Sequence, residues 1–341
     1  MAARRGDTLL FPTPPVVAAH AAIGGKKEGE GPLAACFDAL SADNFFGQSS
    51  WEAAERELAL RTAQLCLKKA QTTPEKVSLV LAGDLQAQCT ASSYAMRELG
   101  IPFAGLFGAC STMAEALGLG AALCSAGMAD GLLAMTSSHF CAAERQFRTP
   151  LSYGAVRTPT AQWTATAAGA CLLRPAGEGV QLCAVTFGRV QDYKIKDINN
   201  MGAAMAPAAA ATLLHYLKDT GSAPEDFDRI YTGDLGHVGS QLLRDLLAAE
   251  GLLLKNHVDC GCILYDAAEQ TVKSGGSGPG CSASVLCGHI LPRLERGTQK
   301  RALFLATGAL MSQTTFLQKE SIPAIAHLVE LRSPQQKEEN G

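Results

Sequence analysis

The sequence predicts an α/β protein built from two copies of one helix-and-strand unit. Three observations carry this prediction: the composition, an internal repeat, and helical segments that alternate with buried strands. Of the 341 residues, 47% are hydrophobic, 18% are charged and 34 are glycine. This composition excludes global disorder and is typical of closely packed α/β layers. The length allows two domains of ordinary size.

The internal repeat is the most specific of these observations. Residues 74–85 (PEKVSLVLAGDL) resemble residues 224–235 (PEDFDRIYTGDL), and residues 108–111 (GACS) resemble residues 279–282 (PGCS). Apolar strands at 131–136 and 302–307 then follow in the same order. Matches in the same order favour duplication of one unit. We therefore expect an N-terminal half at residues 1–175 and a C-terminal half at residues 176–341.

Three helices are expected from periodicity and helix-end signals. In residues 51–70 apolar side chains recur every three or four positions, and lysines at the end suit the helix dipole. Residues 116–129 form an apolar run that is too short to span a membrane, which predicts a buried core helix. Residues 201–217 contain Pro207, which we expect in the first turn of a helix.

Two further segments are expected to be irregular. Residues 143–164 carry three arginines and two prolines, and they predict a long ordered loop that covers another part of the molecule. Residues 333–341 are polar and are expected to fray at the end of the chain.

The net charge and the cysteine content limit which partners and which cellular compartment we expect for this protein. The net charge is −3 and no basic run exceeds two residues, so a nucleic-acid partner is not expected. The 12 cysteines form no CxxC pair, and most lie in apolar runs, which predicts reduced core thiols and no metal site. We expect synthesis in a reducing cytoplasm, no secretory signal and no transmembrane segment.

Cys110 is the first candidate for chemistry. It follows the apolar segment 103–107 and precedes an apolar helix. A thiol at a helix N-terminus meets unpaired N–H groups and the positive end of the helix dipole, which is expected to lower its pKa. Such a thiol suits a nucleophile. The alternative is a small apolar residue packed at a strand-to-helix turn.

A nucleophile needs a base, and three histidines have a suitable turn context. Ser137 and His139 come directly after the buried strand at 131–136, where site residues gather in α/β folds. His237 and His257 are the other two, whereas we interpret His20, His215, His289 and His327 as surface or core residues.

Asp234 and Asp259 also follow strand-like segments. Asp84 stands in the equivalent turn of the first copy, so a purely structural turn role is an alternative for Asp234.

A glycine-rich stretch is the last candidate feature. Residues 274–281 (SGGSGPGC) precede a helix and can present backbone N–H groups to a carboxylate or an oxyanion, with Gly276 at the centre. The stretch matches neither a P-loop nor a dinucleotide fingerprint, so no nucleotide cofactor is expected.

These features together resemble the thiolase and ketoacyl synthase superfamily and, within it, the stage V sporulation protein AD family of spore-forming Firmicutes. The resemblance runs from about residue 9 to residue 332. It rests on these segments: GPLAACFD (31–38), FGACST (107–112), TSSHFCAAERQFRTPLSYG (136–154), NMGAAMAPAAA (200–210), TGDLG (232–236), GGSGPGCSA (275–283) and QKESIPAIAH (318–327).

The resemblance implies a thiolase-like fold of five layers, α-β-α-β-α, with two halves related by a pseudo-twofold axis. It implies binding of dipicolinic acid (pyridine-2,6-dicarboxylic acid), free or as its calcium chelate, in uptake into the developing spore and in germination. It also implies a peripheral place on the spore inner membrane beside membrane proteins of the same operon. By position, Cys110 matches the superfamily nucleophile, and Asp259 lies in the family's Asp-Cys-Gly segment.

Departures from the superfamily pattern bear on catalysis. Ketoacyl synthases of the Cys-His-Asn type carry a histidine where this chain has Gly233 to Gly236, and an asparagine where it has Gly276 to Gly278. Asp234 is anionic and would oppose a thiolate. His237 could replace the base only if the turn differs. We therefore interpret the site as a relic of catalysis reused for binding, and we expect no turnover.

Three hypotheses remain from the sequence. The first is a non-catalytic dipicolinate-binding protein with Cys110, Ser137, His139, Asp234, Asp259 and Gly276 as candidate ligand-binding residues. It has no cofactor of its own, and Asp234 or Asp259 would complete the oxygen shell of calcium if the chelate binds. The second is an acyl-transferring enzyme with Cys110 as nucleophile. The third is a scaffold that docks to membrane proteins through protein contacts. A homodimer is compatible with each.

Overall fold

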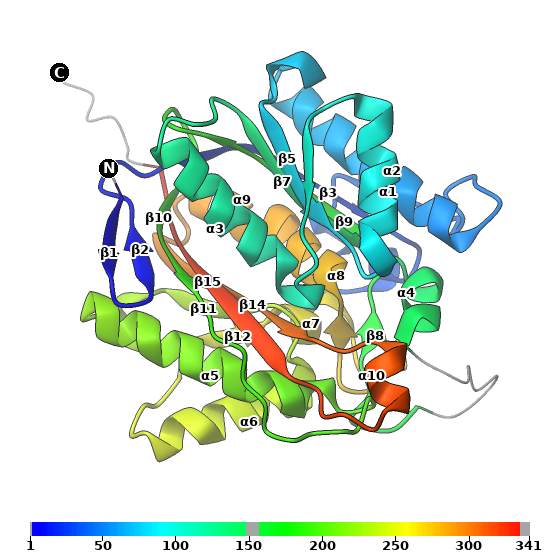
Figure 1. Cartoon of the computed structure of the whole chain (residues 1–341), viewed down its shortest axis with the longest axis vertical. Helices are drawn as coiled ribbons and strands as arrows, with labels where there is room; N and C mark the ends of the chain where they lie inside the picture. Colours follow the sequence, from blue (N-terminus) through cyan, green and yellow to red (C-terminus); the bar gives the residue numbers. More distant parts are fainter. Residues whose placement is uncertain (1, 148–156, 335–341) are drawn as a thin grey trace.

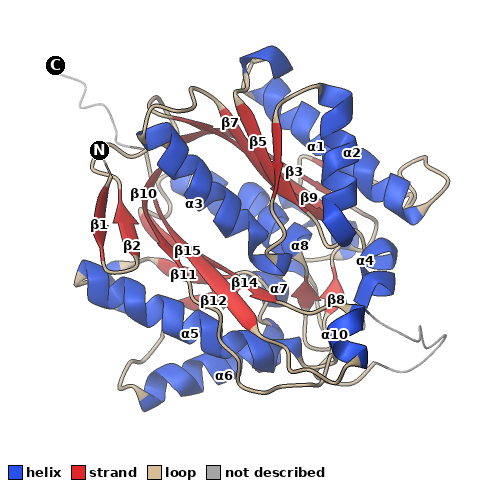
Figure 2. Cartoon of the chain, in the orientation of Figure 1, coloured by secondary structure: helices blue, strands red, loops and turns tan. Residues whose placement is uncertain are grey.

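The computed structural model describes residues 2–147 and 157–334 as one body of alternating helical and sheet layers. Figure 1 shows two sheet layers with one pair of helices between them and further helices outside each sheet. Figure 2 shows the same order of layers by element type. The order is α-β-α-β-α, as expected.

The N-terminal half begins with short strands and then alternates helices with strands. Its strands are β1 (Ala3–Arg5), β2 (Thr8–Leu10), β3 (Val16–Gly24), β4 (Ala39–Leu40), β5 (Leu79–Gly83), β6 (Phe103–Gly105), β7 (Leu132–Ser138), β8 (Trp163–Thr164) and β9 (Ala167–Arg174). Its α-helices are α1 (Trp51–Lys69), α2 (Thr90–Leu99), α3 (Thr112–Ser125) and α4 (Phe140–Phe147), and a 3₁₀ turn, η5 (Ala109–Ser111), leads into α3.

The C-terminal half repeats this order. Its strands are β10 (Val180–Phe187), β11 (Arg229–Thr232), β12 (His257–Asp259), β13 (Gly276–Ser277), β14 (Arg301–Ala309) and β15 (Ala324–Arg332). Its helices are α5 (Met201–Thr220), α6 (Gly236–Ala249), α7 (Cys260–Leu264), α8 (Pro279–Val285), the π-helical segment η7 (Leu286–Ile290), α9 (Leu291–Glu295) and α10 (Gln313–Leu317).

Strand order shows the duplication directly. The main sheet runs β12-β11-β14-β15-β10-β3-β9-β7-β5-β6. Read outward from the β10–β3 junction, each half has the same order, with β3, β9, β7, β5 and β6 matching β10, β15, β14, β11 and β12. The senses match too: β5 is parallel to β6 and β7, and β11 is parallel to β12 and β14. The predicted division at 175/176 falls between β9 and β10, and this boundary itself stays a prediction.

Small residues let the layers approach in the middle of the molecule. Helix α3 packs on strands of both halves, and α8 packs on β7 and β9 of the first half. A methyl group added at Gly118 in α3 would meet Val185 Cγ2 at 2.5 Å, and one added at Gly169 in β9 would meet the Ala283 carbonyl oxygen at 2.3 Å. The glycine content therefore reflects close approach of backbone between layers.

The predicted starts of the helices at residues 51 and 201 are confirmed, whereas the predicted place of Pro207 is wrong. Helix α1 begins at Trp51, and the preceding Ser50 is its N-cap, with a hydroxyl that accepts from the Ala53 N–H. Helix α5 begins at Met201 with Asn200 as its cap, so Pro207 lies in the helix interior. The expectation of Pro207 in the first turn was wrong, because the Asn200 side chain caps the helix further upstream.

The predicted loop at 143–164 is also corrected in part. Its first residues belong to α4, and its last two form β8, which pairs with β13. The ring of His139 accepts from the Ala142 N–H and so favours a helix start there. Residues 148–156 and 335–341, which include most of the predicted loop and tail, lie outside the described residues.

The thiols agree with the sequence prediction. All 12 cysteines are free, and Cys66, Cys124, Cys171, Cys183 and Cys287 are buried. In the part of the chain that the structure describes, no helix is both long and apolar enough to cross a membrane.

Candidate binding site around Cys110

A cavity of about 410 Å³ opens where strands of both halves end. Strand β5 leads into its wall at Leu85, β6 leads to Phe107, β14 leads to Leu310, and α5 begins on it at Met201. The remaining lining residues are small, apolar or neutral polar: Ala87, Ala109, Cys110, Gln146, Thr164, Ser277, Ala309, Met311, Ser312 and Thr315. Among the described residues, none that lines this cavity carries a charge or an imidazole ring.

Cys110 is held at the inner wall of the cavity by the turn that starts α3. The Ser111 hydroxyl donates to the Gly108 carbonyl at 2.6 Å, and the Thr112 hydroxyl donates to the Ala109 carbonyl at 2.7 Å. Ala109 has a φ of 52°, a left-handed conformation that is strained for a residue with a Cβ. These contacts fix the direction of the Cys110 side chain, which is 7% exposed.

The predicted lowering of the Cys110 pKa was wrong. Burial raises the pKa of this thiol well above its usual value, and the negative charge of Asp234, which accepts a hydrogen bond from the thiol, raises it further. The helix N-terminus favours a thiolate, but desolvation and a neighbouring carboxylate disfavour it more. Cys110 is therefore a protonated thiol at neutral pH.

Asp234 lies behind the cavity wall and joins three segments. Its Oδ2 accepts from the Ser277 hydroxyl at 3.0 Å and from the Gly278 N–H at 2.9 Å, and its Oδ1 accepts from the Thr307 hydroxyl at 2.9 Å. Burial raises the pKa of Asp234 to about 6. The two places where ketoacyl synthases carry histidine and asparagine thus do converge on Cys110, but here they supply a hydrogen-bonded carboxylate and a serine.

Asp259 supports the turn that carries Asp234. It accepts from the Thr232 hydroxyl at 2.6 Å and from the backbone N–H groups of Leu235 and Gly236 at 2.8 and 3.0 Å. It also caps α7 by accepting from Cys262 N–H at 3.1 Å. Because both oxygens of Asp234 and of Asp259 are engaged and neither residue lines the cavity, the geometry does not favour them as calcium ligands.

Ser137 and His139 point away from the cavity, toward α1. The Ser137 hydroxyl donates to Glu55 Oε1 at 3.1 Å. His139 Nε2 lies 2.8 Å from the Asn44 carbonyl, and its ring packs against Trp51. Burial lowers the pKa of His139. The imidazole is therefore a neutral structural group, and ligand contact by either residue stays a prediction.

The remaining sequence candidates are placed as follows. Gly276 lies in β13 against β8, and its carbonyl accepts from the Gln162 amide at 2.9 Å. Its neighbour Ser277 reaches the cavity. His237 is exposed at the start of α6, and His257 contacts the Thr232 hydroxyl at 2.8 Å. In the described ranges, no three His, Cys, Asp or Glu side chains are grouped to hold a metal ion.

Sequence reasoning missed most of the cavity wall. Phe107, Leu310 and Met311 are apolar residues that directly follow strands, and Phe107 is 59% exposed. The position after a strand end was a usable signal, since these ends meet at one edge of the sheet. Gln162 gave no signal, because its contacts are made with residues distant in sequence.

Solved structures identify the fold as thiolase-like. The structure is similar to 3-oxoacyl-[acyl-carrier-protein] synthase III of Aquifex aeolicus, with a TM-score of 0.57, 12% identity and coverage of 93% of this chain and 99% of that one. It is also similar to cerulenin-bound OleA of Xanthomonas campestris, with a TM-score of 0.62, 15% identity and coverage of 97% and 99%. At these identities the likeness defines the fold alone.

The family follows from the sequence comparison. The model of the stage V sporulation protein AD family matches residues 5–332. Stage V sporulation protein AD of Bacillus subtilis (strain 168) is 42% identical over 322 residues, which cover 94% of this chain and 95% of that protein. The chain belongs to the stage V sporulation protein AD family, and its role lies in stage V of sporulation.

Proposed function

We propose that the protein is a non-catalytic binding protein for dipicolinic acid or its calcium chelate, acting in uptake into the developing spore and in germination. Family membership supports a role in sporulation, and the sequence resemblance implies the ligand. The cavity beside Cys110 is the site in which we place it. Its volume of about 410 Å³ lies in the range of small-molecule sites.

The cavity wall suits the two parts of such a ligand differently. A flat pyridine ring packs against apolar side chains such as Phe107, Leu310 and Met311. The two carboxylates need hydrogen-bond donors. The side-chain donors that this wall offers are the Ser312 hydroxyl and the Gln146 amide.

The state of Cys110 is the observation that carries the non-catalytic part of this proposal. A nucleophilic thiol needs a base or a lowered pKa, whereas burial and Asp234 raise the pKa of this thiol. His139 and His257 are engaged elsewhere, and His237 is exposed.

Equilibrium titration of the purified protein with dipicolinate, with and without calcium, tests the proposal. We expect saturable binding in at least one condition and loss of binding in Ala87→Phe, which places a ring in the cavity from an exposed wall position. Met128→Phe, at a position 74% exposed outside the cavity, is the matched control and should bind as the parent does. Absence of saturable binding in both conditions would contradict the proposal.

Acyl transfer is the second candidate, and the position of Cys110 on a largely apolar cavity favours it. This function predicts stoichiometric labelling of Cys110 by an acyl thioester, or by an alkylating reagent at mildly acidic pH, where only a thiol of lowered pKa reacts. Mass spectrometry that finds Cys110 unlabelled would remove this candidate.

We also propose that the protein acts peripherally at the spore inner membrane beside membrane proteins of its operon. The proposal rests on the family resemblance, and contact would be through protein surfaces. A second copy of the chain remains a further proposed partner. Co-purification of the tagged protein with these membrane proteins from sporulating cells tests the association, with a soluble cytoplasmic protein as control.

A further inference from the structure

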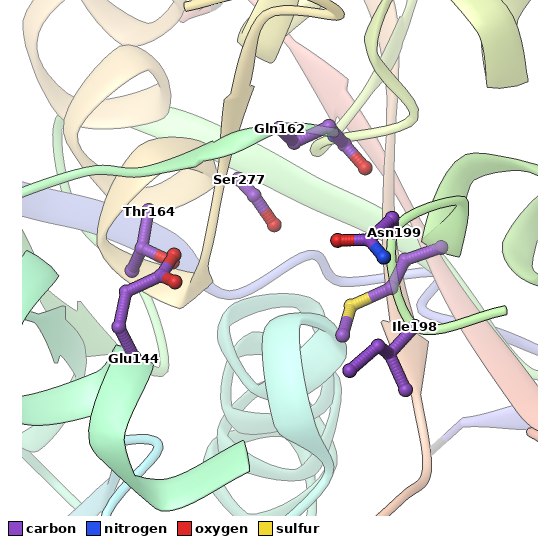
Figure 3. Close-up of a pocket in the computed structure, with 7 residues that line it drawn as sticks. Glu144, Gln162, Thr164, Ile198, Asn199 and Ser277 are labelled. Carbon is purple, nitrogen blue, oxygen red and sulfur yellow. The ribbon is translucent and has the colours of Figure 1, made fainter. Parts of the chain in front are cut away.

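A second, much smaller chamber adjoins the cavity. It measures about 20 Å³ and is lined by Glu144, Gln162, Thr164, Ile198, Asn199, Met201 and Ser277. Figure 3 shows these side chains around one common space. Thr164, Met201 and Ser277 line both spaces, so the chamber lies directly behind one part of the cavity wall.

Gln162 has a fixed orientation in this chamber. Its Nε2 donates to the Asp234 carbonyl at 2.6 Å and to the Gly276 carbonyl at 2.9 Å. A flipped amide would place its oxygen against those two carbonyl oxygens, so the orientation is determined by the network. Gln162 is only 8% exposed, and its Oε1 has no hydrogen-bond partner among the described residues.

The hydroxyls beside Gln162 also offer acceptors. The Ser277 proton is directed to Asp234 Oδ2 at 3.0 Å, and the Thr164 proton is directed to Glu144 Oε1 at 3.3 Å. Both oxygens therefore present lone pairs to the chamber. Together with Gln162 Oε1, they give the chamber three acceptor oxygens, beside the Glu144 carboxylate and the Asn199 amide that also line it.

We propose that this chamber is a built site for one water molecule, positioned by Gln162, which serves the ligand in the adjoining cavity. A buried acceptor without a partner is unfavourable, and the chamber volume exceeds the roughly 10–15 Å³ that one water needs. One O–H of this water donates to Gln162 Oε1. The second can donate to Ser277, to Thr164 or, through the wall that these residues share with the cavity, to the ligand.

The water changes the hydrogen-bonding character of the wall. Gln162, Ser277 and Thr164 present acceptors, which repel a carboxylate, whereas a water held by Gln162 alone has one O–H left to donate to the ligand. This step rests on the proposed function. The water then donates to one of the two carboxylates of the ligand. Gln162 is then a positioning residue that favours a dicarboxylate over a monocarboxylate.

Comparison of pyridine-2,6-dicarboxylate with pyridine-2-carboxylate tests the assignment. We expect Gln162→Met to lower the ratio of the affinity for the dicarboxylate to the affinity for the monocarboxylate roughly tenfold. The reason is that the second carboxylate loses its hydrogen bond from the water. A general lesion of the fold would weaken both ligands equally. Gln241→Met, at an exposed position on α6 outside both the chamber and the cavity, is the matched control and should keep the ratio. An unchanged ratio in Gln162→Met overturns the assignment.

A high-resolution crystal structure of the parent protein gives a second measurement that needs no variant. We expect electron density for one water within hydrogen-bond distance of Gln162 Oε1, and its absence overturns the water site. If the parent protein binds neither pyridine ligand, the proposed function fails, while the density still decides the water site by itself.

Discussion

At the scale of single residues, Cys110 and Asp234 decide the chemistry of the site. Both are buried, and the anion raises the pKa of the thiol beside it. Asp84, the repeat partner of Asp234, is likewise buried and accepts from Ser92 and the Gln86 N–H. The copies share an aspartate that joins segments, and in each copy burial and the charge of this aspartate raise the pKa of a nearby thiol, Cys89 beside Asp84 and Cys110 beside Asp234. Asp234 therefore has the structural role that the sequence predicted as its alternative, because its carboxylate joins separate segments of the chain.

Removing the charge of Asp234 tests this account at the same scale. In Asp234→Asn the pKa of the Cys110 thiol should fall, because a negative charge beside the thiolate is removed. Alkylation of Cys110, followed by peptide mass spectrometry across pH, should reach its midpoint at lower pH than in the parent. Asp245→Asn, at an exposed site on α6, should leave the midpoint unchanged. Equal midpoints in Asp234→Asn and the parent would show that burial alone sets the pKa.

At the scale of elements, close packing of α8 on β9 joins the two halves. Gly169 allows the Ala283 backbone to approach, and the Thr136 hydroxyl on neighbouring β7 donates to the Pro279 carbonyl at 2.9 Å. This contact places the glycine-rich turn before α8, and with it Ser277, against the cavity. Element packing thus positions one wall of the site.

A methyl group at this contact should destabilise the protein. Gly169→Ala forces the Ala283 backbone to move, and overpacking of this kind typically costs about 1–3 kcal/mol. Gly29→Ala is the control, because its added methyl would meet only the flexible Leu40 side chain, at 3.2 Å. Urea unfolding should show a lower midpoint for Gly169→Ala alone. Similar midpoints for both variants would mean that the contact relaxes without cost.

At the scale of the whole molecule, buried carboxylates and histidines set the pH dependence of stability. Burial and the charge of Asp84 raise the pKa of Glu55 to about 8. The folded state therefore holds this proton more tightly than the unfolded state, and its contribution is lost as pH rises toward 8. Burial lowers the pKa of His257, His289 and His327 to about 4. The fold is therefore stabilised as pH rises from about 4, and this effect is complete only above pH 6.5, the usual pKa of histidine.

Between about pH 7 and 8, where the histidines and Asp234 have largely finished titrating, Glu55 should account for the steepest part of the remaining pH dependence. In the parent protein we expect the free energy of unfolding to fall across this window by up to about 1.4 kcal/mol for each step of one in pH, because the folded state alone keeps the proton. Glu55→Gln removes the titrating group and should flatten the profile. Glu98→Gln, whose side chain is 48% exposed, should keep the slope of the parent. A flat profile in the parent would contradict the raised pKa of Glu55.

Local patterns in the sequence determined much of this molecule. The repeat predicted two equivalent halves, periodicity predicted α1, a short apolar run predicted the buried α3, and the strand-to-helix turn singled out Cys110. These features depend on neighbours within one or two turns of the chain, or on whole-segment likeness. The resemblance to a sporulation family, carried by long segments, was confirmed by the family match.

The tertiary structure alone decided the character of the site. The pKa of Cys110 depends on Asp234, the orientation of Gln162 depends on Gly276, and the cavity wall combines residues from five or more segments. Such contacts join residues far apart in the chain, so no local pattern reports them. The sequence placed a thiol at a helix start, and its surroundings in the folded protein determine that it stays protonated.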